Sequence, residues 1–190
     1  MRGALAVALL LGFAPPASPA AADWNVTTLF EMLSREKPGR ALFKERKYLS
    51  LLDKPVDSSG ELTFTPPHTL EKRTVLPKPE RVLVDRDRLT LERGGKTYSL
   101  GLRENPSIAI LVESIRGTLA GDLASLTRTY SAGLDGDAAS WRLKLRPLDP
   151  SLSTLVERIE IAGSQARVKS VEIFQADGDR SVMSLAPAPR

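Results

Sequence analysis

The chain of 190 residues contains no cysteine, and it has one histidine and few aromatic residues. Without cysteine the protein can form no disulfide, offer no thiolate nucleophile or metal ligand, and carry no acylated N-terminal cysteine of the lipoprotein type. We therefore expect a fold held by its core alone, in a protein that is not itself a lipoprotein.

Signatures of catalysis are also missing. The lone histidine, His68, follows Pro66-Pro67 in a turn, and the nearby sequence shows no nucleophile with an orienting carboxylate. Asp85-Arg86-Asp87 and Asp177-Gly178-Asp179 are typical of tight turns, since neither continues as a calcium-binding loop. There is no P-loop, dinucleotide fingerprint or G-x-S-x-G elbow. We expect no enzyme activity, no metal site and no cofactor.

Charge of one sign is nowhere concentrated. The formal net charge is +4, and the densest basic cluster, Lys44-Glu45-Arg46-Lys47, is interrupted by an acid. A nucleic-acid-binding protein would need a clearer basic stripe, so nucleic acid is not an expected partner. Apolar residues make up 42% of the chain and charged residues 26%, which is typical of one soluble globular domain at this length.

The N-terminus resembles a secretory signal. Arg2 precedes an apolar run over residues 4–14, which is too short to span a bilayer, and small residues and prolines follow. We predict a signal peptide over residues 1–22, cleaved after Ala20 or Ala22, and a single mature domain over residues 23–190. The alternative is an N-terminal membrane anchor. Cleavage would release a soluble protein into the periplasm.

Hydrophobic periodicity predicts strands around a helical centre. Val26, Leu29, Phe30 and Leu33 form one stripe of a helix over residues 24–35. Asn105-Pro106 begins a second helix that ends at Gly117 or Gly121, and a short third helix follows from Asp122. Alternation and turn residues, including the hairpin turn Gly94-Gly95, predict strands over 41–48, 49–52, 60–65, 69–76, 81–85, 89–93, 97–102, 127–132, 139–148, 156–162, 167–174 and 180–185.

Short strands joined by tight turns favour an antiparallel meander in the mainly-β, α+β class. We predict an unclosed antiparallel β-barrel of about ten to eleven strands, with helices covering its apolar concave face. That face could be ordinary core or the wall of a cavity for acyl chains, because both require apolar residues. The candidate lipid-binding residues are Phe43, Leu62, Phe64, Leu83, Ile108, Leu111, Val112, Ile115, Trp141, Leu143 and Leu145.

The order of several motifs resembles a known family. They are Phe43-Lys44-Glu45-Arg46-Lys47, Gly60-Glu61-Leu62-Thr63-Phe64, the segment PHTLEKR at 67–73, Pro79-Glu80 before Val82-Leu83-Val84-Asp85, LAGDL at 119–123, WRLKLRP at 141–147 and Gly178-Asp179-Arg180. The motifs up to Asp85 are similar to the periplasmic lipoprotein carrier LolA and its relatives, and the later ones are similar to a shorter branch, the LolA-related proteins.

The resemblance implies a helical lid over an apolar cavity and a role in carrying lipoprotein acyl chains toward the outer membrane. It also implies a monomer that meets an inner-membrane donor and an outer-membrane acceptor. The carriers have a lid-tying arginine just before the strand-leading proline, where this chain has Pro66. The C-terminal extension of the carriers is also expected to be missing after Leu185.

Three functions remain open at this point. The first is a periplasmic carrier for an acylated lipoprotein or another amphiphile. The second is a dedicated chaperone for a lipid-like biosynthetic product, such as a polyene or a glycolipid, which fits the changed lid position. The third is an interaction module without a cavity, which would use the basic face of Arg142, Lys144 and Arg146.

Overall fold

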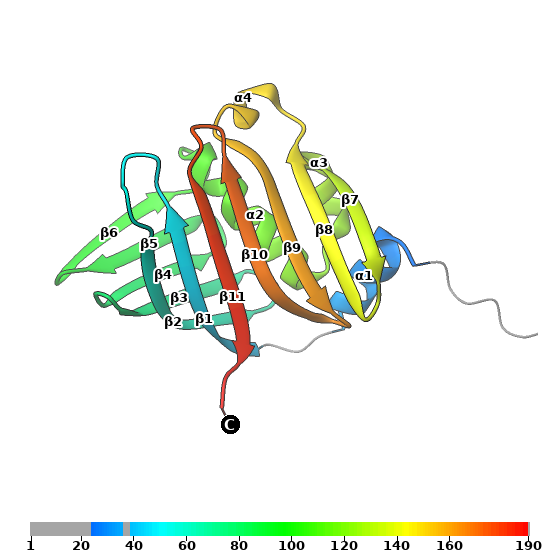
Figure 1. Ribbon diagram of the computed structural model, residues 1–190, viewed down its shortest axis with the longest axis horizontal. Coiled ribbons are helices and arrows are strands. Elements are labelled where there is room, and N and C mark those ends of the chain that lie inside the picture. Colours follow the sequence, from blue (N-terminus) through cyan, green and yellow to red (C-terminus); the bar gives the residue numbers. More distant parts are fainter. Residues whose placement is uncertain (1–23, 36–38, 190) are drawn as a thin grey trace, which may run out of the picture.

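The computed structural model describes residues 24–35 and 39–189, so the predicted signal peptide lies outside the described residues. Within these ranges the chain forms eleven strands and four helices, and every strand joins one antiparallel sheet (Figure 1). The prediction of about ten to eleven strands in an unclosed barrel is confirmed.

The sheet consists of two meanders. The first contains β1 (Gly39–Tyr48), β2 (Val56–Thr65), β3 (Thr69–Leu76), β4 (Glu80–Asp85), β5 (Arg88–Arg93) and β6 (Lys96–Gly101). The second contains β7 (Tyr130–Asp137), β8 (Ser140–Pro147), β9 (Val156–Ser164), β10 (Arg167–Gln175) and β11 (Arg180–Pro187). The first and last strands pair from Ala41 with Pro187 to Tyr48 with Arg180, which joins the two meanders. β6 and β7 remain as the open edges of the sheet.

Four helices accompany the sheet: α1 (Val26–Leu33), α2 (Pro106–Ala120), α3 (Leu123–Thr129) and α4 (Pro150–Ser153). Local chemistry sets the starts of α1 and α3, whereas Asn105 before α2 makes no side-chain cap and donates instead to the carbonyl of Gly101 at 2.7 Å. The side chain of Asn25 accepts a hydrogen bond from the Thr28 amide at 3.0 Å, and Asp122 accepts one from the Ser125 amide at 2.9 Å. Gly121, rather than Gly117, ends α2 in the left-handed conformation, at φ +66°.

One predicted strand is wrong, and another begins three residues too early. Residues 49–52 form the connection between β1 and β2, where the Ser50 amide donates to Asp179 on another turn at 2.7 Å. The segment 127–132 begins as helix, because α3 continues to Thr129 and the Thr127 hydroxyl donates to the carbonyl of Leu123. β7 begins only at Tyr130. The short helix α4 was not predicted, although Asp149-Pro150 is the same kind of start as Asn105-Pro106, and Asp149 accepts a hydrogen bond from the Ser151 amide at 2.8 Å.

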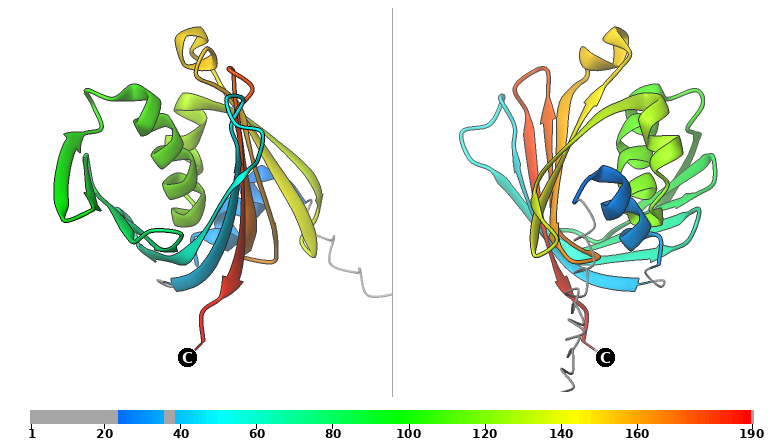
Figure 2. Two further views of the ribbon diagram at one scale, coloured as in Figure 1. Left: turned by 60° about the vertical axis from the view of Figure 1, so that its left-hand side comes forward. Right: turned by 90° about the vertical axis from the view of Figure 1, so that its right-hand side faces the viewer.

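The sheet curves around α1, α2 and α3, which lie on its concave side, whereas α4 lies in the connection between β8 and β9 at one end of the sheet (Figure 2). Two clusters of buried side chains fill the space between them. One cluster joins α1, α3 and strands β7 to β10, and it includes Leu29, Phe30, Trp141, Leu143 and Leu145. The other joins α2 to strands β1 to β5. A cavity lies where the two clusters meet over the middle of the sheet.

Candidate functional site

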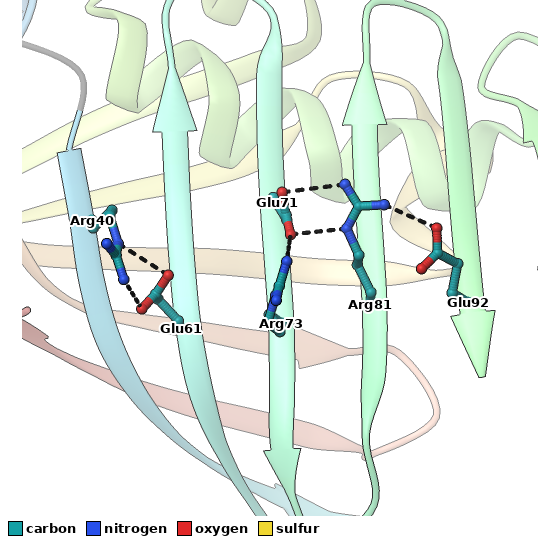
Figure 3. Close-up of polar contacts among 6 residues, drawn as sticks. All are labelled: Arg40, Glu61, Glu71, Arg73, Arg81 and Glu92. Atoms are coloured by element: carbon teal, nitrogen blue, oxygen red, sulfur yellow. Dashed lines mark hydrogen bonds and ion pairs between the residues drawn. The ribbon is translucent and has the colours of Figure 1, made fainter. Parts of the chain in front are cut away.

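The convex face of the first meander is covered by paired charges (Figure 3). Arg81 on β4 donates to Glu71 on β3 and to Glu92 on β5, at 2.9 Å in both cases. Arg40 pairs with Glu61 farther along the same face. Hydrogen bonds from Arg81 and Arg73 outweigh the effect of burial and hold the pKa of Glu71 below its usual value. Such exposed pairs add little stability, but they keep this face in water.

The opposite, concave face borders a cavity of about 130 Å³. Its walls come from three parts of the fold. Strands β2, β3 and β4 contribute Leu62, Leu70, Lys72, Val82 and Val84; strands β9, β10 and β11 contribute Ile161, Val168, Val171, Met183 and Leu185; and α2 contributes Leu111, Val112, Ile115, Thr118 and Leu119. The hydroxyl of Thr118 donates to the Ser114 carbonyl of its own helix at 2.7 Å. The lining is therefore apolar except at Lys72.

The structure divides the predicted site residues into three groups. Leu62, Leu111, Val112 and Ile115 line the cavity, while Phe43, Phe64 and Ile108 pack in the adjoining cluster. Trp141, Leu143 and Leu145 do not border the cavity and belong to the closely packed core beneath α1 and α3.

Leu83 does not join any of these groups. Its neighbours Val82 and Val84 contribute to the cavity wall and the packed cluster beside it, and strand alternation turns Leu83 to the convex face. Its register partners are Glu71 and Thr90, and Glu71 belongs to the charged ladder of that face. The assignment of Leu83 to the cavity face is therefore corrected to Val82 and Val84.

The cavity exists because α2 stands off the sheet. The main backbone neighbours of α2 are the helices α1, α3 and α4, so it approaches the strands through side chains. Two hydrogen bonds fix its position. The Tyr130 hydroxyl donates to the carbonyl of Ile110, and burial raises the pKa of this phenol. Arg116 donates to the carbonyl of Arg86 in the turn between β4 and β5, at 2.8 Å.

The Arg116 contact lies at the same end of the sheet as Pro66. Pro66 precedes β3 and Arg86 follows β4, and Thr69 pairs with Asp85 where these two strands meet their turns. The resemblance implied an arginine on the sheet at the Pro66 position. In this chain an arginine on the helix itself makes a contact between α2 and the sheet.

The one charged side chain of the cavity wall belongs to a buried polar cluster that the sequence analysis missed. Lys72 Nζ lies 2.5 Å from Glu45 Oε2 on β1 and 4.8 Å from the centre of the Phe43 ring. Glu45 is 6% exposed and also accepts hydrogen bonds from the hydroxyls of Ser181, at 2.7 Å, and Ser58, at 3.2 Å. Lys47 Nζ lies 3.8 Å from the other carboxylate oxygen.

The groups around Glu45 favour its ionised form. Burial alone would raise the pKa of Glu45, but the ammonium of Lys72, with help from Lys47 and the Ser181 hydroxyl, outweighs it and lowers that pKa. The sequence does contain a signal for the cluster. Glu45 alternates in phase with Phe43, and Lys72 alternates in phase with Leu70, so both occupy positions where alternation predicts apolar residues.

The basic stripe of β8 is largely paired within the fold. Arg142 donates to Glu160 at 2.8 Å, and Lys144 Nζ lies 2.6 Å from Asp135. Arg146 is exposed. Because acidic partners compensate two of its three charges, this face has little free positive charge for a partner.

The described residues contain no group of three or more His, Asp or Glu side chains that could hold a metal ion. Among the same residues, no helix is long and apolar enough to cross a membrane.

Comparisons with solved structures find chains of related shape at low identity. The LolA superfamily protein NE2245 from Nitrosomonas europaea is 11% identical, with a TM-score of 0.45 over 86% of this chain and 92% of that one. LprF from Mycobacterium bovis is 16% identical, with a TM-score of 0.35 over 87% and 94%. A chain of the Pseudomonas aeruginosa MucA/MucB complex is 12% identical, with a TM-score of 0.43 over 87% and 58%.

A search of curated protein sequences finds no match. The model of one protein family, described as outer membrane lipoprotein carrier protein LolA-like, matches residues 16–190, which is nearly the whole chain. On that match this protein belongs to the LolA-like family.

Proposed function

We propose that this protein is a periplasmic carrier that shields the acyl chains of a lipoprotein or another lipid during transfer toward the outer membrane. The observation that carries the proposal is the apolar cavity between α2 and the concave face of the sheet. An unfilled void in a protein interior costs about 24 cal/mol per Å³, so a void of this size costs about 3 kcal/mol. A ligand that fills it recovers that stability, which corresponds to about 0.8 kcal/mol for each methylene group that it buries.

The size of the cavity indicates what the closed form can hold. An engineered cavity of about 150 Å³ takes up one benzene molecule, so the present space suits the end of an acyl chain rather than a whole one. A full chain needs more room, which displacement of α2 would provide, because the strands are held to each other by continuous hydrogen bonding. The helices therefore act as a lid in this proposal.

The test is direct detection of bound lipid. Native mass spectrometry of the protein purified from the periplasm should show co-purifying acylated molecules, and a fluorescent fatty-acid probe should bind the delipidated protein. Binding of a lipid-like biosynthetic product alone would favour the specialised chaperone. A protein that is isolated empty and does not take up the probe would contradict the carrier.

Two neighbouring substitutions on β4 test the location. Val82→Gln places an amide in the apolar cavity wall, whereas Leu83→Gln places the same amide on the convex face. We expect probe binding to weaken in Val82→Gln and to remain in Leu83→Gln. Equal effects of the two substitutions would place the acyl site elsewhere.

A further inference from the structure

The polar cluster around Glu45 interrupts the concave face where an apolar wall would be sufficient. Pairing two buried charges gives little net stability, because the cost of removing them from water offsets their attraction. Lys72 is the charged member that contacts the cavity, and its side chain is 23% exposed. It therefore lies between the apolar cavity and solvent.

Register explains how Lys72 reaches Glu45. Lys72 pairs with Leu62 on β2, whereas Glu45 pairs with Ser58 farther along the same strand. The lysine side chain must therefore run diagonally across β2, over the ring of Phe43. Gly60, the residue opposite Phe43, lets β3 approach closely here, because a Cβ at this position would lie 1.9 Å from the carbonyl oxygen of Arg73.

The hydrogen bonds of the cluster leave capacity for a ligand. An ammonium group has three N–H donors, and among the described residues Glu45 is the hydrogen-bond acceptor for Lys72. Glu45 in turn has two hydroxyl donors, Ser58 and Ser181. Lys72 can therefore turn an N–H toward a ligand while the carboxylate keeps its other partners.

The charges of the cluster determine which ligand it favours. Lys72 and Lys47 are two cations beside the single carboxylate of Glu45, so the cluster carries one uncompensated positive charge. Lys47 is 46% exposed, so the positive charge extends from the cavity wall toward solvent. A single anionic oxygen group neutralises the cluster, whereas a neutral headgroup does not.

We propose that Lys72, supported by Lys47, binds the anionic headgroup of the amphiphile whose acyl chain occupies the cavity. This inference rests on the proposed carrier function and adds a ligand class and an orientation to it. The ligand carries a carboxylate or a phosphodiester next to its acyl chain. Its charged end lies at the Lys72–Glu45 cluster, and its chain extends between α2 and the sheet.

The experiment compares ligands with the same acyl chain and different headgroups. Myristic acid, myristoyl lysophosphatidylglycerol and the neutral monomyristin each displace a fluorescent fatty-acid probe from the delipidated full-length mature protein. We expect the anionic ligands to bind on the order of ten-fold tighter than monomyristin, as charged hydrogen bonds allow. The difference between the two anions identifies whether a carboxylate or a phosphodiester fits better.

Substitutions then assign the preference to the cluster. Lys72→Met should remove the preference for anions, so that the three ligands bind with similar affinity, whereas Glu45→Gln should increase the preference several-fold by freeing the lysine. Lys44→Met changes an exposed lysine on the convex face of β1 and serves as the control. The double variant Lys72→Met/Glu45→Gln has no unpaired charge in the pair, and it should also lack the preference if Lys72→Met alone does not fold.

The outcomes separate this inference from the carrier proposal. Equal binding of all three ligands, unchanged by either substitution, would overturn the headgroup site and leave the carrier intact. If no ligand displaces the probe and the probe itself does not bind, both proposals fail.

Discussion

Replacing Val82 by phenylalanine enlarges a side chain at the strand wall of the cavity while α2 stays unchanged. The void is about 130 Å³, and at about 24 cal/mol per Å³ it costs about 3 kcal/mol. A ring that fills part of it should raise the free energy of unfolding by about 1 kcal/mol. Phenylalanine also suits a half-buried strand position.

The same change should weaken ligand binding. If the ring occupies the place of two methylenes, the loss is about 1.6 kcal/mol, which raises the Kd of an acyl probe about fifteen-fold. Urea unfolding followed by circular dichroism measures the first effect, and titration with a fluorescent fatty-acid probe measures the second.

Val156→Phe is the matched control, because Val156 is 2% exposed in the packed core and borders no cavity. Overpacking there should lower the free energy of unfolding by about 1–3 kcal/mol. The reasoning is refuted if Val82→Phe destabilises the protein as much as Val156→Phe and leaves probe affinity unchanged.

Three further predictions concern the lid, the polar cluster and the packed core. Arg116→Met removes the hydrogen bond between α2 and the β4–β5 turn, which should lower the barrier to displacement of α2 by about 1 kcal/mol. Probe association should then be about five-fold faster in stopped-flow measurements. Arg128→Met, on α3, should not change this rate. Because the pKa of Glu45 is lowered, its ionised form stabilises the fold above the unfolded pKa of about 4.3, and this contribution is lost as pH falls through the folded value. Glu45→Gln should therefore be about 2 kcal/mol less stable than the unchanged protein at neutral pH, and the difference between the two proteins should narrow below pH 4. Urea unfolding at a series of pH values measures this difference. Gly163→Ala places a methyl group 2.3 Å from the Trp141 ring and should cost about 2–3 kcal/mol of unfolding free energy without changing probe affinity.

Strand alternation predicted most of the sheet, because most strands have one apolar and one polar face. The prediction of strands failed for apolar or β-branched runs that do not pair with a neighbouring strand. Leu51 is 94% exposed at the tip of the β1–β2 connection. Thr127 bonds to its own helix because the Asp122 cap had already started one. Long-range contacts and helix caps determined the structure of these two segments, although their local sequences favour strands.

The site was harder to predict, since apolar alternation is the same in a packed core and in a cavity wall. Leu143 and Leu62 follow identical patterns, yet Leu143 is fully buried in a packed cluster and Leu62 borders the void. The difference arises from how far α2 stands from strands that are distant in the sequence. The phase of alternation was nevertheless informative, since it would have separated Leu83 from Val82 and Val84.

Admission of a whole acyl chain can be treated as an exchange between the lid and the ligand. Displacing α2 breaks two hydrogen bonds, from Tyr130 and Arg116, which together contribute about 2 kcal/mol. At about 0.8 kcal/mol per buried methylene, about three methylenes beyond those that fit the closed cavity offset this loss. The apolar surface that α2 uncovers is buried again by the chain itself. Long chains can therefore hold the lid open, whereas short ones bind within the closed cavity, and chain length becomes the property that couples binding to the position of α2.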